Sequence, residues 1–372
     1  MKKILYVSMY DISRGGVQKC IETWISNFRN REDYIIDWYC PGKIQNLEYY
    51  GDLINKDINI VLGNIDGERK YLTFKYFRDL YSLMRKNKYD IVHINTGIVS
   101  GTYITVLISK ICKTSKIISH SHSASQNSTA SYSWYKKMLL NIMKKGIVKN
   151  SDILCACSTL AASFLFSTND ILNSNVKIIM NGIDLHRFEY NAEIRVKIRK
   201  RNNADEKIII GFVGTINDQK NATFALEIYK EIHKNNPETL FWIAGEGPLK
   251  ESLINKSIEE GIDKNVAFLG EVDNVNELMH AMDALIFPSS SEGLGIVAVE
   301  AQMSGLKVFA SDAVPKETEL SNLISFLSLN ESAKYWADYI MDNIVYQREK
   351  QGMEKFEKFS SVKSAYLVET LY

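Results

Sequence analysis

The sequence alternates short β-branched runs with longer amphipathic segments along most of its length, and this pattern restricts the possible folds more than any other feature. Strands that alternate with helices favour a parallel sheet covered by helices on both faces. The expected strands lie at residues 4–8, 34–39, 58–62, 91–94, 117–120, 153–157, 176–179, 208–213, 240–244, 266–269, 284–287 and 307–310. The pattern predicts an α/β protein built from doubly wound, Rossmann-like sheets.

The chain is long enough for two such domains. It has 372 residues, whereas one domain usually contains about 100–200. The turn at 181–184 and the charged stretch 193–207 mark the expected boundary, with one domain over 1–185 and a second over 186–350. The last segment is expected to be helical. Ligands of open α/β sheets bind beyond the carboxyl ends of the strands, so we expect the site in a cleft between the domains.

Charge and cysteine content narrow the functional classes. The net charge of +1 argues against a general nucleic-acid binder, which usually carries a basic excess. The cysteines are odd in number and form no C-x-x-C pair, which argues against a disulfide framework or a zinc site and favours a reducing cytosol. They are Cys20, Cys40, Cys112, Cys155 and Cys157. No signal peptide or membrane-spanning run is visible, so we expect a cytoplasmic protein, at most peripheral to the membrane.

Segment 287–300, with the sequence FPSSSEGLGIVAVE, carries the most chemical information. It follows an apolar strand and enters a helix, with Glu292 and Glu300 separated by seven residues. Gly293 and Gly295 allow the backbone to approach a ligand closely, and the N-terminus of the following helix suits a diphosphate. The two carboxylates can accept hydrogen bonds from sugar and ribose hydroxyls. The alternative is an ordinary surface loop followed by an exposed helix.

This segment resembles the signature of the family-4 retaining glycosyltransferases, and in particular the enzymes of capsule and exopolysaccharide synthesis. Further matching pieces follow the family's order along nearly the whole chain. They are GGVQK at 15–19, ACS at 156–158, NGID at 181–184, GFVG at 211–214, QKN at 219–221, IAGEGP at 243–248, FLG at 268–270 and SD at 311–312. The resemblance implies the GT-B fold, in which two Rossmann-like domains face each other and a C-terminal helix, here 351–372, packs back on the N-terminal domain.

The resemblance also implies roles for residues of the second half. Glu292 would hold hydroxyls of the donor sugar, and Glu300 would bind the nucleotide ribose. Lys220 would neutralise phosphate charge as the nucleoside diphosphate leaves, although it could also be a solvated lysine at a helix start. Gly245 would line the wall near the base, or simply form a tight turn. The remaining residues expected to bind the donor are Gly214, Thr215, Gly293, Leu294, Gly295 and Ile296 in this half, with Gly15 and Gly16 from the first half.

Thr215 departs from the family pattern. The family usually has an arginine directly after the glycine that Gly214 matches, and this arginine acts on the donor phosphates together with the lysine. A threonine can donate one hydrogen bond but brings neither charge nor a bidentate fork. Another cation could compensate, donor binding could be weaker, or activity could be reduced. Lys316, which lies beyond the site helix in the sequence, is a speculative substitute.

The first half is expected to supply the acceptor side. Gly15 and Gly16 lie between the first strand and its helix and could hold phosphate on backbone N–H groups or form a plain tight turn. The family commonly has a histidine near the reacting sugar. His122 is the favoured match, and His120 is the alternative, as a core or supporting histidine. His93, at the end of another strand, reads as structural although it lies on the same acceptor side.

The resemblance implies a reaction without a metal ion. The sequence contains no D-x-D motif, which coordinates metal and diphosphate in the other major glycosyltransferase fold. We therefore expect no cofactor and no metal, with a helix dipole and a lysine in the metal's place. The implied mechanism is a same-face displacement through an ion-pair-like intermediate, in which the departing phosphate helps to deprotonate the acceptor.

A basic stretch forms the second local feature. Residues 113–151 contain seven lysines and no acidic residue, and a helix expected from Trp134 to Lys149 places Leu139, Ile142, Met143 and Ile147 at helical spacing. Such a helix can lie on an anionic bilayer. A core-packed helix with a solvated lysine face is an equally good interpretation from the pattern alone.

The leading hypothesis is a retaining glycosyltransferase that uses a nucleotide sugar, expected to be a UDP-sugar, to build a surface polysaccharide on a lipid-linked or saccharide acceptor. A sugar-nucleotide epimerase of the same fold would bind the donor without an acceptor site, and turnover of the donor alone would distinguish it. A catalytically weak subunit that binds nucleotide or stabilises a partner enzyme is the alternative outside catalysis. Thr215 is its only support in the sequence.

Overall fold

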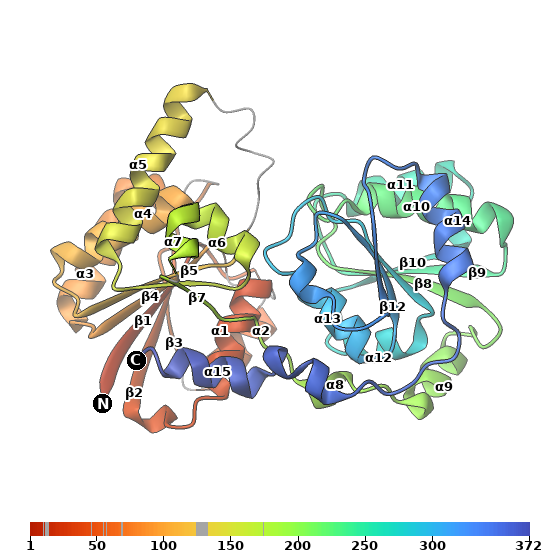
Figure 1. Ribbon diagram of the computed structural model, residues 1–372, viewed down its shortest axis with the longest axis horizontal. Helices are drawn as coiled ribbons and strands as arrows, with labels where there is room; N and C mark the ends of the chain where they lie inside the picture. Colours follow the sequence, from red (N-terminus) through yellow and green to blue (C-terminus); the bar gives the residue numbers. More distant parts are fainter. Residues whose placement is uncertain are drawn as a thin grey trace. The chain divides into compact units, whose positions relative to one another are not determined.

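The computed structural model describes residues 1–9, 11, 15–45, 47–54, 56, 58–67, 70–123, 133–173 and 175–372. These residues divide into two compact units. The N-terminal unit comprises Met1–Gly182 together with Lys358–Tyr372, and the C-terminal unit comprises Ile183–Glu357. In each unit a central sheet is flanked by helices, as Figure 1 shows. The chain crosses between the units at the turn expected from the sequence, within three residues of the expected boundary.

The N-terminal unit contains a parallel sheet with the strand order β3-β2-β1-β4-β5-β6-β7. Its strands are β1 (Lys2–Ser8), β2 (Tyr34–Cys40), β3 (Asn59–Leu62), β4 (Ile91–Thr96), β5 (Lys116–Ser121), β6 (Ile153–Ala156) and β7 (Val176–Ile178). Its helices are α1 (Gly16–Ser26), α2 (Leu47–Ile54), α3 (Phe74–Asn87), α4 (Val99–Ile111), α5 (Trp134–Asn150), α6 (Thr159–Leu165), α7 (Thr168–Leu172) and α15 (Ser361–Glu369). Each strand expected in this half is confirmed.

Strand β1 shows why this sheet is buried on both faces. Its successive side chains point to opposite faces. Ile4 and Tyr6 enter one hydrophobic core with Trp24 of α1, whereas Leu5 and Val7 enter a second core on the other side. Such a continuous apolar run is typical of a central parallel strand.

Helix α15 completes the N-terminal unit although it is distant from the rest in sequence. It packs against α1. The indole N–H of Trp24 donates to Ser364 Oγ at 2.8 Å, and the Glu369 carboxylate accepts from the backbone N–H groups of Arg29 at 3.1 Å and Asn30 at 2.9 Å. The chain rejoins the N-terminal unit at Lys358. This is seven residues later than expected, since residues 351–357 still belong to the C-terminal unit.

The C-terminal unit contains a second parallel sheet, with the order β10-β9-β8-β11-β12-β13. Its strands are β8 (Ile208–Val213), β9 (Thr239–Ala244), β10 (Val266–Gly270), β11 (Ala284–Phe287), β12 (Lys307–Ser311) and β13 (Ile324–Leu327). Its helices are α8 (Leu185–Phe188), α9 (Ala192–Arg201), α10 (Ala222–Asn235), α11 (Lys250–Glu259), α12 (Val275–Ala281), α13 (Ile296–Met303) and α14 (Ala333–Asn343). The expected class, two Rossmann-like sheets with helices on both faces, is confirmed.

Two features of this unit differ from expectation. The charged stretch 193–207, expected to mark the domain boundary, lies inside the C-terminal unit. It contains most of α9, whose Arg195 and Arg199 both bind the buried carboxylate of Asp283, at 2.5 and 3.0 Å. Strand β13 was not expected. Two parallel strands are usually connected by an α-helix, and the helical pattern helps to predict the strand that follows. Between β12 and β13 the chain forms only a single 3₁₀ turn, Lys316–Thr318, so this pattern is missing.

In the described part of the chain, no helix combines the length and the hydropathy needed to cross a membrane.

Candidate active site

Two glycines shape the carboxyl edge of the C-terminal sheet. Gly214 follows β8 with φ of 146° and Gly245 follows β9 with φ of 142°, a region that side chains rarely adopt. The two loops also touch: a Cβ on Gly245 would stand 2.0 Å from the carbonyl oxygen of Gly214. The backbone N–H of Gly245 is fixed by the Gly270 carbonyl at 2.8 Å. This close approach alone accounts for glycine at position 245, as the tight-turn alternative expects, and a role for Gly245 in the wall near the base stays a prediction.

Lys220 and Glu292 meet at the same edge. The Lys220 ammonium donates to Glu292 Oε1 at 2.5 Å and lies 5.3 Å from the centroid of the Phe287 ring. Only 20% of the lysine side chain and 7% of the glutamate side chain are exposed. A solvated lysine would not be held in this way, so the plain interpretation of Lys220 as a surface residue is wrong.

Hydrogen bonds between two loops hold this pair in place. Gln219 Nε2 donates to the Ser291 carbonyl at 2.9 Å, and the Ser290 N–H donates to the Gln219 carbonyl at 2.8 Å. The Asn217 side chain accepts the N–H of Lys220 at 2.9 Å. Lys220 in the loop after β8 and Glu292 in the loop after β11 are 72 positions apart in sequence, but the two loops together fix one ammonium beside one carboxylate.

Helix α13 begins directly beside this pair. Gly295 is its N-cap, with φ of 83°, and no side chain caps the first turn. Gly293, Leu294 and Gly295 are buried, whereas Ile296 and Glu300 are partly exposed. Backbone N–H groups at an uncapped helix start carry a partial positive charge that attracts anions. The arrangement can therefore receive a diphosphate at α13 with Lys220 close by.

Lys316 and Lys250 can be compared as the cation that replaces the family's arginine at position 215. Thr215 is exposed. Lys316 does not point towards it, because its ammonium lies 3.2 Å from the centroid of the Phe326 ring, and Phe326 belongs to β13 at the sheet's edge. Lys250 begins α11, which follows the loop that pairs with the Thr215 loop. Its ammonium binds Glu246 at 2.5 Å, and the Glu246 backbone carbonyl accepts the Ile216 N–H at 2.9 Å. The sequence offered only a lysine at a helix start as a signal for Lys250.

The polar residues of the N-terminal unit form a different kind of cluster. The rings of His93, His120 and His122 lie close together and roughly parallel, with ring centroids 5.4 Å apart for the first pair and 4.4 Å for the second, and the Trp24 ring stacks on those of His93 and His120. Among the described residues, no group of three or more His, Cys, Asp or Glu side chains has the arrangement of a metal site.

A hydrogen-bond relay runs through this stack. The Tyr372 hydroxyl lies 2.7 Å from His93 Nδ1, and His93 Nε2 lies 3.2 Å from His120 Nδ1. The hydroxyl of Tyr6 bonds that of Tyr372. His93 and His120 are fully buried, so the structure gives them supporting positions under His122 and no direct access to an acceptor. The relay through Tyr372 was not foreseen, since nothing in the sequence links two residues 279 positions apart.

Burial keeps the histidines uncharged. It lowers the pKa of His93 to about 3 and that of His120 well below its ordinary value, and the neighbouring His122 lowers both further. The pKa of His122 also falls to about 3 because of burial, although the Asn181 side chain raises it in part. His122 Nε2 lies 3.0 Å from Asn95 Oδ1. A neutral imidazole in this position can exchange a hydrogen bond with a sugar hydroxyl but supplies no charge.

Gly15 and Gly16 lie before and at the start of α1. Gly15 has an ordinary extended φ of −70°, and a Cβ at Gly16 would meet nothing within 4 Å. Neither position needs glycine for its conformation. The space at Gly16 is compatible with close approach of a ligand, as the sequence suggested.

Comparison with known proteins identifies the chain. The family described as "Glycosyltransferase Family 4" matches residues 14–187, and the family "Glycosyl transferases group 1" matches residues 194–346. The chain belongs to glycosyltransferase family 4. The resemblance stated from the sequence is thereby confirmed for both halves of this glycosyltransferase.

Relatives and solved structures agree with the family. The chain is 29% identical over 351 residues to EpsF of Bacillus subtilis, which is named as a glycosyltransferase, covering 91% of this chain and 87% of EpsF. It is 27% identical over 247 residues to an Escherichia coli UDP-Gal:α-D-GlcNAc-diphosphoundecaprenol α-1,3-galactosyltransferase, covering 63% of this chain and 60% of that enzyme. The fold is similar to that of HepE from Anabaena, solved with UDP, at a TM-score of 0.76 and 17% identity, covering 100% of this chain and 99% of HepE. The fold is therefore GT-B.

Proposed function

We propose that this glycosyltransferase transfers a hexose or N-acetylhexosamine from a UDP-sugar to a lipid-linked or saccharide acceptor in surface polysaccharide synthesis. The observation that carries the proposal is the buried Lys220–Glu292 pair at 2.5 Å, beside the uncapped start of α13. Among the similar structures, HepE was solved with UDP-glucose. The E. coli relative is named for a UDP-galactose donor and a diphosphoundecaprenol-linked acceptor. We infer that the enzyme works in the cytoplasm, at the inner face of the membrane.

The donor binds at the carboxyl edge of the C-terminal sheet in this proposal. An ammonium has three N–H donors, so Lys220 can keep Glu292 and still donate to a phosphate oxygen. The backbone from Gly293 to Ile296 faces the diphosphate, Glu292 accepts hydroxyls of the sugar, and Glu300 binds the ribose. As the bond to the sugar breaks, negative charge grows on the leaving UDP, and the ammonium and the helix start stabilise it without reorganising.

His122 acts on the reacting sugar in this proposal. As an uncharged imidazole it donates or accepts one hydrogen bond at a sugar hydroxyl, and it places no positive charge beside an oxocarbenium-like centre. The departing phosphate takes the acceptor proton on the same face, so the anomeric configuration is retained. No metal ion takes part, because Lys220 and the α13 start supply the positive charge.

The product's anomeric configuration tests this mechanism. Purified enzyme, a UDP-sugar and a synthetic lipid-linked sugar acceptor would be incubated with EDTA, and the new linkage would be assigned by NMR. We expect the donor's α-configuration in the product and a rate that EDTA does not change. A β-linked product would contradict retention, and loss of activity in EDTA that Mg²⁺ or Mn²⁺ restores would contradict metal independence.

One observation favours a second candidate. Thr215 is exposed and uncharged where the family usually carries arginine, so the protein could bind nucleotide and stabilise a partner enzyme with little turnover of its own. The presence of Glu292, Glu300, Lys220 and His122, with Lys220 bound to Glu292, argues for an active donor site. Turnover of a donor by the purified chain alone distinguishes the two candidates.

A further inference from the structure

The described contacts that anchor helix α5 to the N-terminal unit lie in its later turns. Ile147 is fully buried. Gly146 approaches α4 so closely that a Cβ there would stand 2.3 Å from the ring of Tyr103. The Lys144 ammonium donates to the Ser163 carbonyl at 3.4 Å, and burial lowers its pKa. These residues belong to the packed face, so Lys144 and Ile147 are not part of an outward surface.

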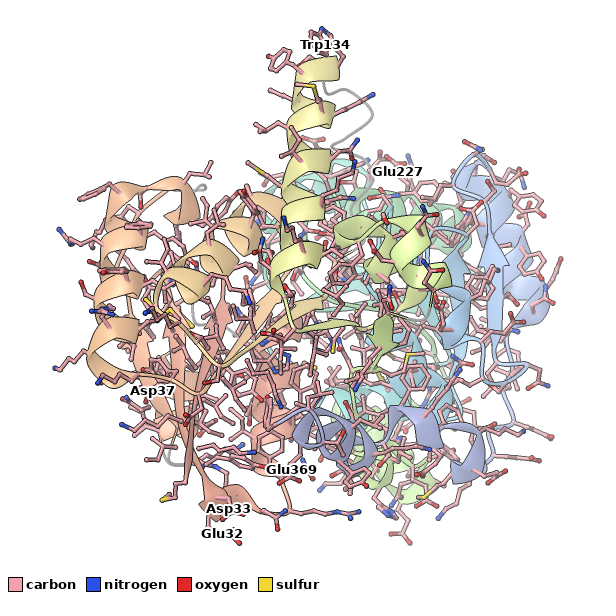
Figure 2. All side chains as sticks on the ribbon, turned by 60° about the vertical axis from the view of Figure 1, so that its left-hand side comes forward. Glu32, Asp33, Asp37, Trp134, Glu227 and Glu369 are labelled. Atoms are coloured by element: carbon pink, nitrogen blue, oxygen red, sulfur yellow. The ribbon has the colours of Figure 1, made fainter. Side chains whose placement is uncertain are left out.

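The first turns of α5 have a different environment. Figure 2 shows Trp134 at the tip of the helix, beyond the rest of the N-terminal unit. Five large apolar side chains in these turns are half exposed or more: Trp134 by 74%, Tyr135 by 54%, Met138 by 52%, Leu139 by 50% and Ile142 by 53%. Single exposed apolar residues are normal, but a group of this kind marks an interaction surface.

These five side chains share one face of the helix. Trp134, Met138 and Ile142 are four residues apart and therefore lie in one line, with Tyr135 and Leu139 in the adjacent line. Gly146, which packs against Tyr103 of α4, follows Leu139 by seven residues and lies in the same line, whereas Ile147 lies on the other side of the helix. The apolar line is therefore covered by α4 in the later turns and exposed in the first turns. The interpretation of α5 as a wholly core-packed helix with a solvated lysine face is wrong for these first turns.

Two exposed lysines extend the line of exposed apolar side chains along α5. Lys145 and Lys149 follow Ile142 at three and seven residues and are exposed. Segment 113–151 has seven lysines and no acidic residue; its residues 124–132 lie outside the described part of the chain. A second copy docking on this face would bring like charges together. An anionic bilayer surface instead matches the lysines, and tryptophan and tyrosine favour the bilayer interface.

We propose that the face of α5 formed by Trp134, Tyr135, Met138, Leu139 and Ile142, with Lys145 and Lys149, binds the surface of an anionic lipid bilayer. The apolar side chains enter the interfacial region while the two lysines meet lipid phosphates. The proposal rests on the proposed function for its biological purpose, since a lipid-linked acceptor lies in such a membrane. Its test requires no sugar donor and can fail independently.

Co-sedimentation with vesicles tests the surface. We expect the protein to pellet with vesicles of phosphatidylglycerol and phosphatidylcholine, and less with phosphatidylcholine alone. Replacing the exposed line (Trp134→Ser, Met138→Ser, Ile142→Ser) should abolish pelleting, and Lys145→Glu with Lys149→Glu should weaken it about tenfold or more. The matched control changes exposed residues of α9, Val196→Ser with Lys197→Glu and Lys200→Glu, and should pellet like the parent protein.

Tryptophan fluorescence gives a second readout. All five tryptophans lie in the described part of the chain, and Trp134 is exposed by 74% whereas the others are exposed by 4% or less: Trp24, Trp38, Trp242 and Trp336. Iodide in the aqueous phase should therefore quench mainly Trp134. Addition of phosphatidylglycerol vesicles should remove this quenching.

Three results would overturn the proposal. They are no pelleting with anionic vesicles, unchanged pelleting of the Ser variant, and quenching of Trp134 that vesicles do not alter. Concentration-dependent dimers that the Ser variant abolishes, without vesicle binding, would assign the face to a second copy instead. If pelleting behaves as expected but no donor is hydrolysed, the surface stands and the proposed enzyme function fails.

Discussion

The C-terminal unit holds an ammonium and a carboxylate together at the carboxyl edge of its sheet, whereas the N-terminal unit holds three uncharged histidine rings. Lys220 and Glu292 form an ion pair with each other, and each can still form further hydrogen bonds to a charged ligand. His93, His120 and His122 lose their charge to burial. One unit is suited to bind and release a diphosphate, and the other to contact a sugar without adding charge.

The two clusters are also supported differently. Neighbouring loop backbones hold Lys220 and Glu292, so this region can be read from short motifs. The histidine stack is held by Tyr372, which follows α15, and by Trp24 of α1. The difference implies that changes in the first cluster alter donor binding and departure of UDP, while changes in the second alter turnover or stability.

The largest effect is expected from the charged pair. Lys220→Ala should lower the rate of UDP release by about 100- to 1,000-fold, because the growing phosphate charge loses its nearest cation, and should destabilise the fold because Glu292 stays buried without its partner. The double variant Lys220→Met with Glu292→Gln should regain stability in urea unfolding but not activity. Initial rates of UDP release and unfolding midpoints would be measured.

The control for this pair is Lys256→Ala, which breaks an ion pair with Glu227 of similar length, 2.5 Å, but with more exposed side chains. Such surface pairs contribute about 1 kcal/mol or less, so activity and stability should barely change. If Lys220→Ala behaved like Lys256→Ala, the pair would have no special part in the donor site.

The second effect is expected at His122. His122→Ala should lower kcat by about 100-fold through loss of one hydrogen bond that matters in the transition state. The UDP dissociation constant should stay within about twofold, because the proposed nucleotide site lies in the other unit. Calorimetric titration with UDP and initial rates would separate the two quantities. The control His186→Ala changes an exposed histidine and should alter neither kcat nor the UDP dissociation constant. Weaker UDP binding in His122→Ala would contradict the proposal that the nucleotide site and His122 act separately in the two units.

The third effect is the dependence of the free energy of unfolding on pH. The histidine pKa values, about 3 for His93 and His122 in the folded chain, lie below the unfolded value of about 6.5. The unfolded state therefore binds more protons below about pH 6.5, and the free energy of unfolding should fall as pH falls towards 4, by up to about 1.4 kcal/mol per pH unit for each histidine.

Urea unfolding at several pH values between 7.5 and 5 would measure this slope. His280 is also buried, with its pKa lowered to about 4 by burial and by the neighbouring Arg348, so the useful quantity is the difference between parent and variant. His93→Gln should reduce the slope, while His186→Gln should leave it unchanged. Equal slopes in the parent and His93→Gln would show that the stack carries no depressed pKa at His93.

The smallest effect is expected at Thr215. Thr215→Arg should lower KM for the UDP-sugar by about three- to tenfold, because a guanidinium can bind phosphate oxygens in a bidentate manner. Lys250→Ala should raise KM by a similar factor if Lys250 compensates for the threonine. Thr215→Val is the control for the hydroxyl alone. Unchanged KM in both the arginine and alanine variants would mean that neither position contacts the donor.

The fold followed from the sequence because hydrophobic periodicity reports which strand faces are buried, and twelve strands were placed in this way. The same signal misses β13 (Ile324–Leu327), since its short apolar run follows a connection without an α-helix. It also does not show how the polar, helix-prone stretch 193–207 is packed. Composition alone cannot show that Arg195 and Arg199 reach Asp283, more than 80 residues away.

The candidate site was only partly predictable. Glu292, Glu300 and Lys220 lie in local motifs whose spacing is fixed by a loop and a helix turn, so the sequence points to them. Which histidine lies outermost depends on strand register and packing, and the structure separates His122 from the fully buried His93 and His120. Tyr372 and Lys250 become visible only when distant segments are brought together.

The most direct test of the account is hydrolysis of a panel of UDP-sugars by the purified chain in EDTA, with Lys220→Ala and Glu292→Ala assayed in parallel. The account predicts slow release of UDP from one donor and loss of that release in both variants, while Lys256→Ala remains active. No release from any donor, with UDP binding intact, would contradict it and favour a nucleotide-binding subunit of a partner enzyme.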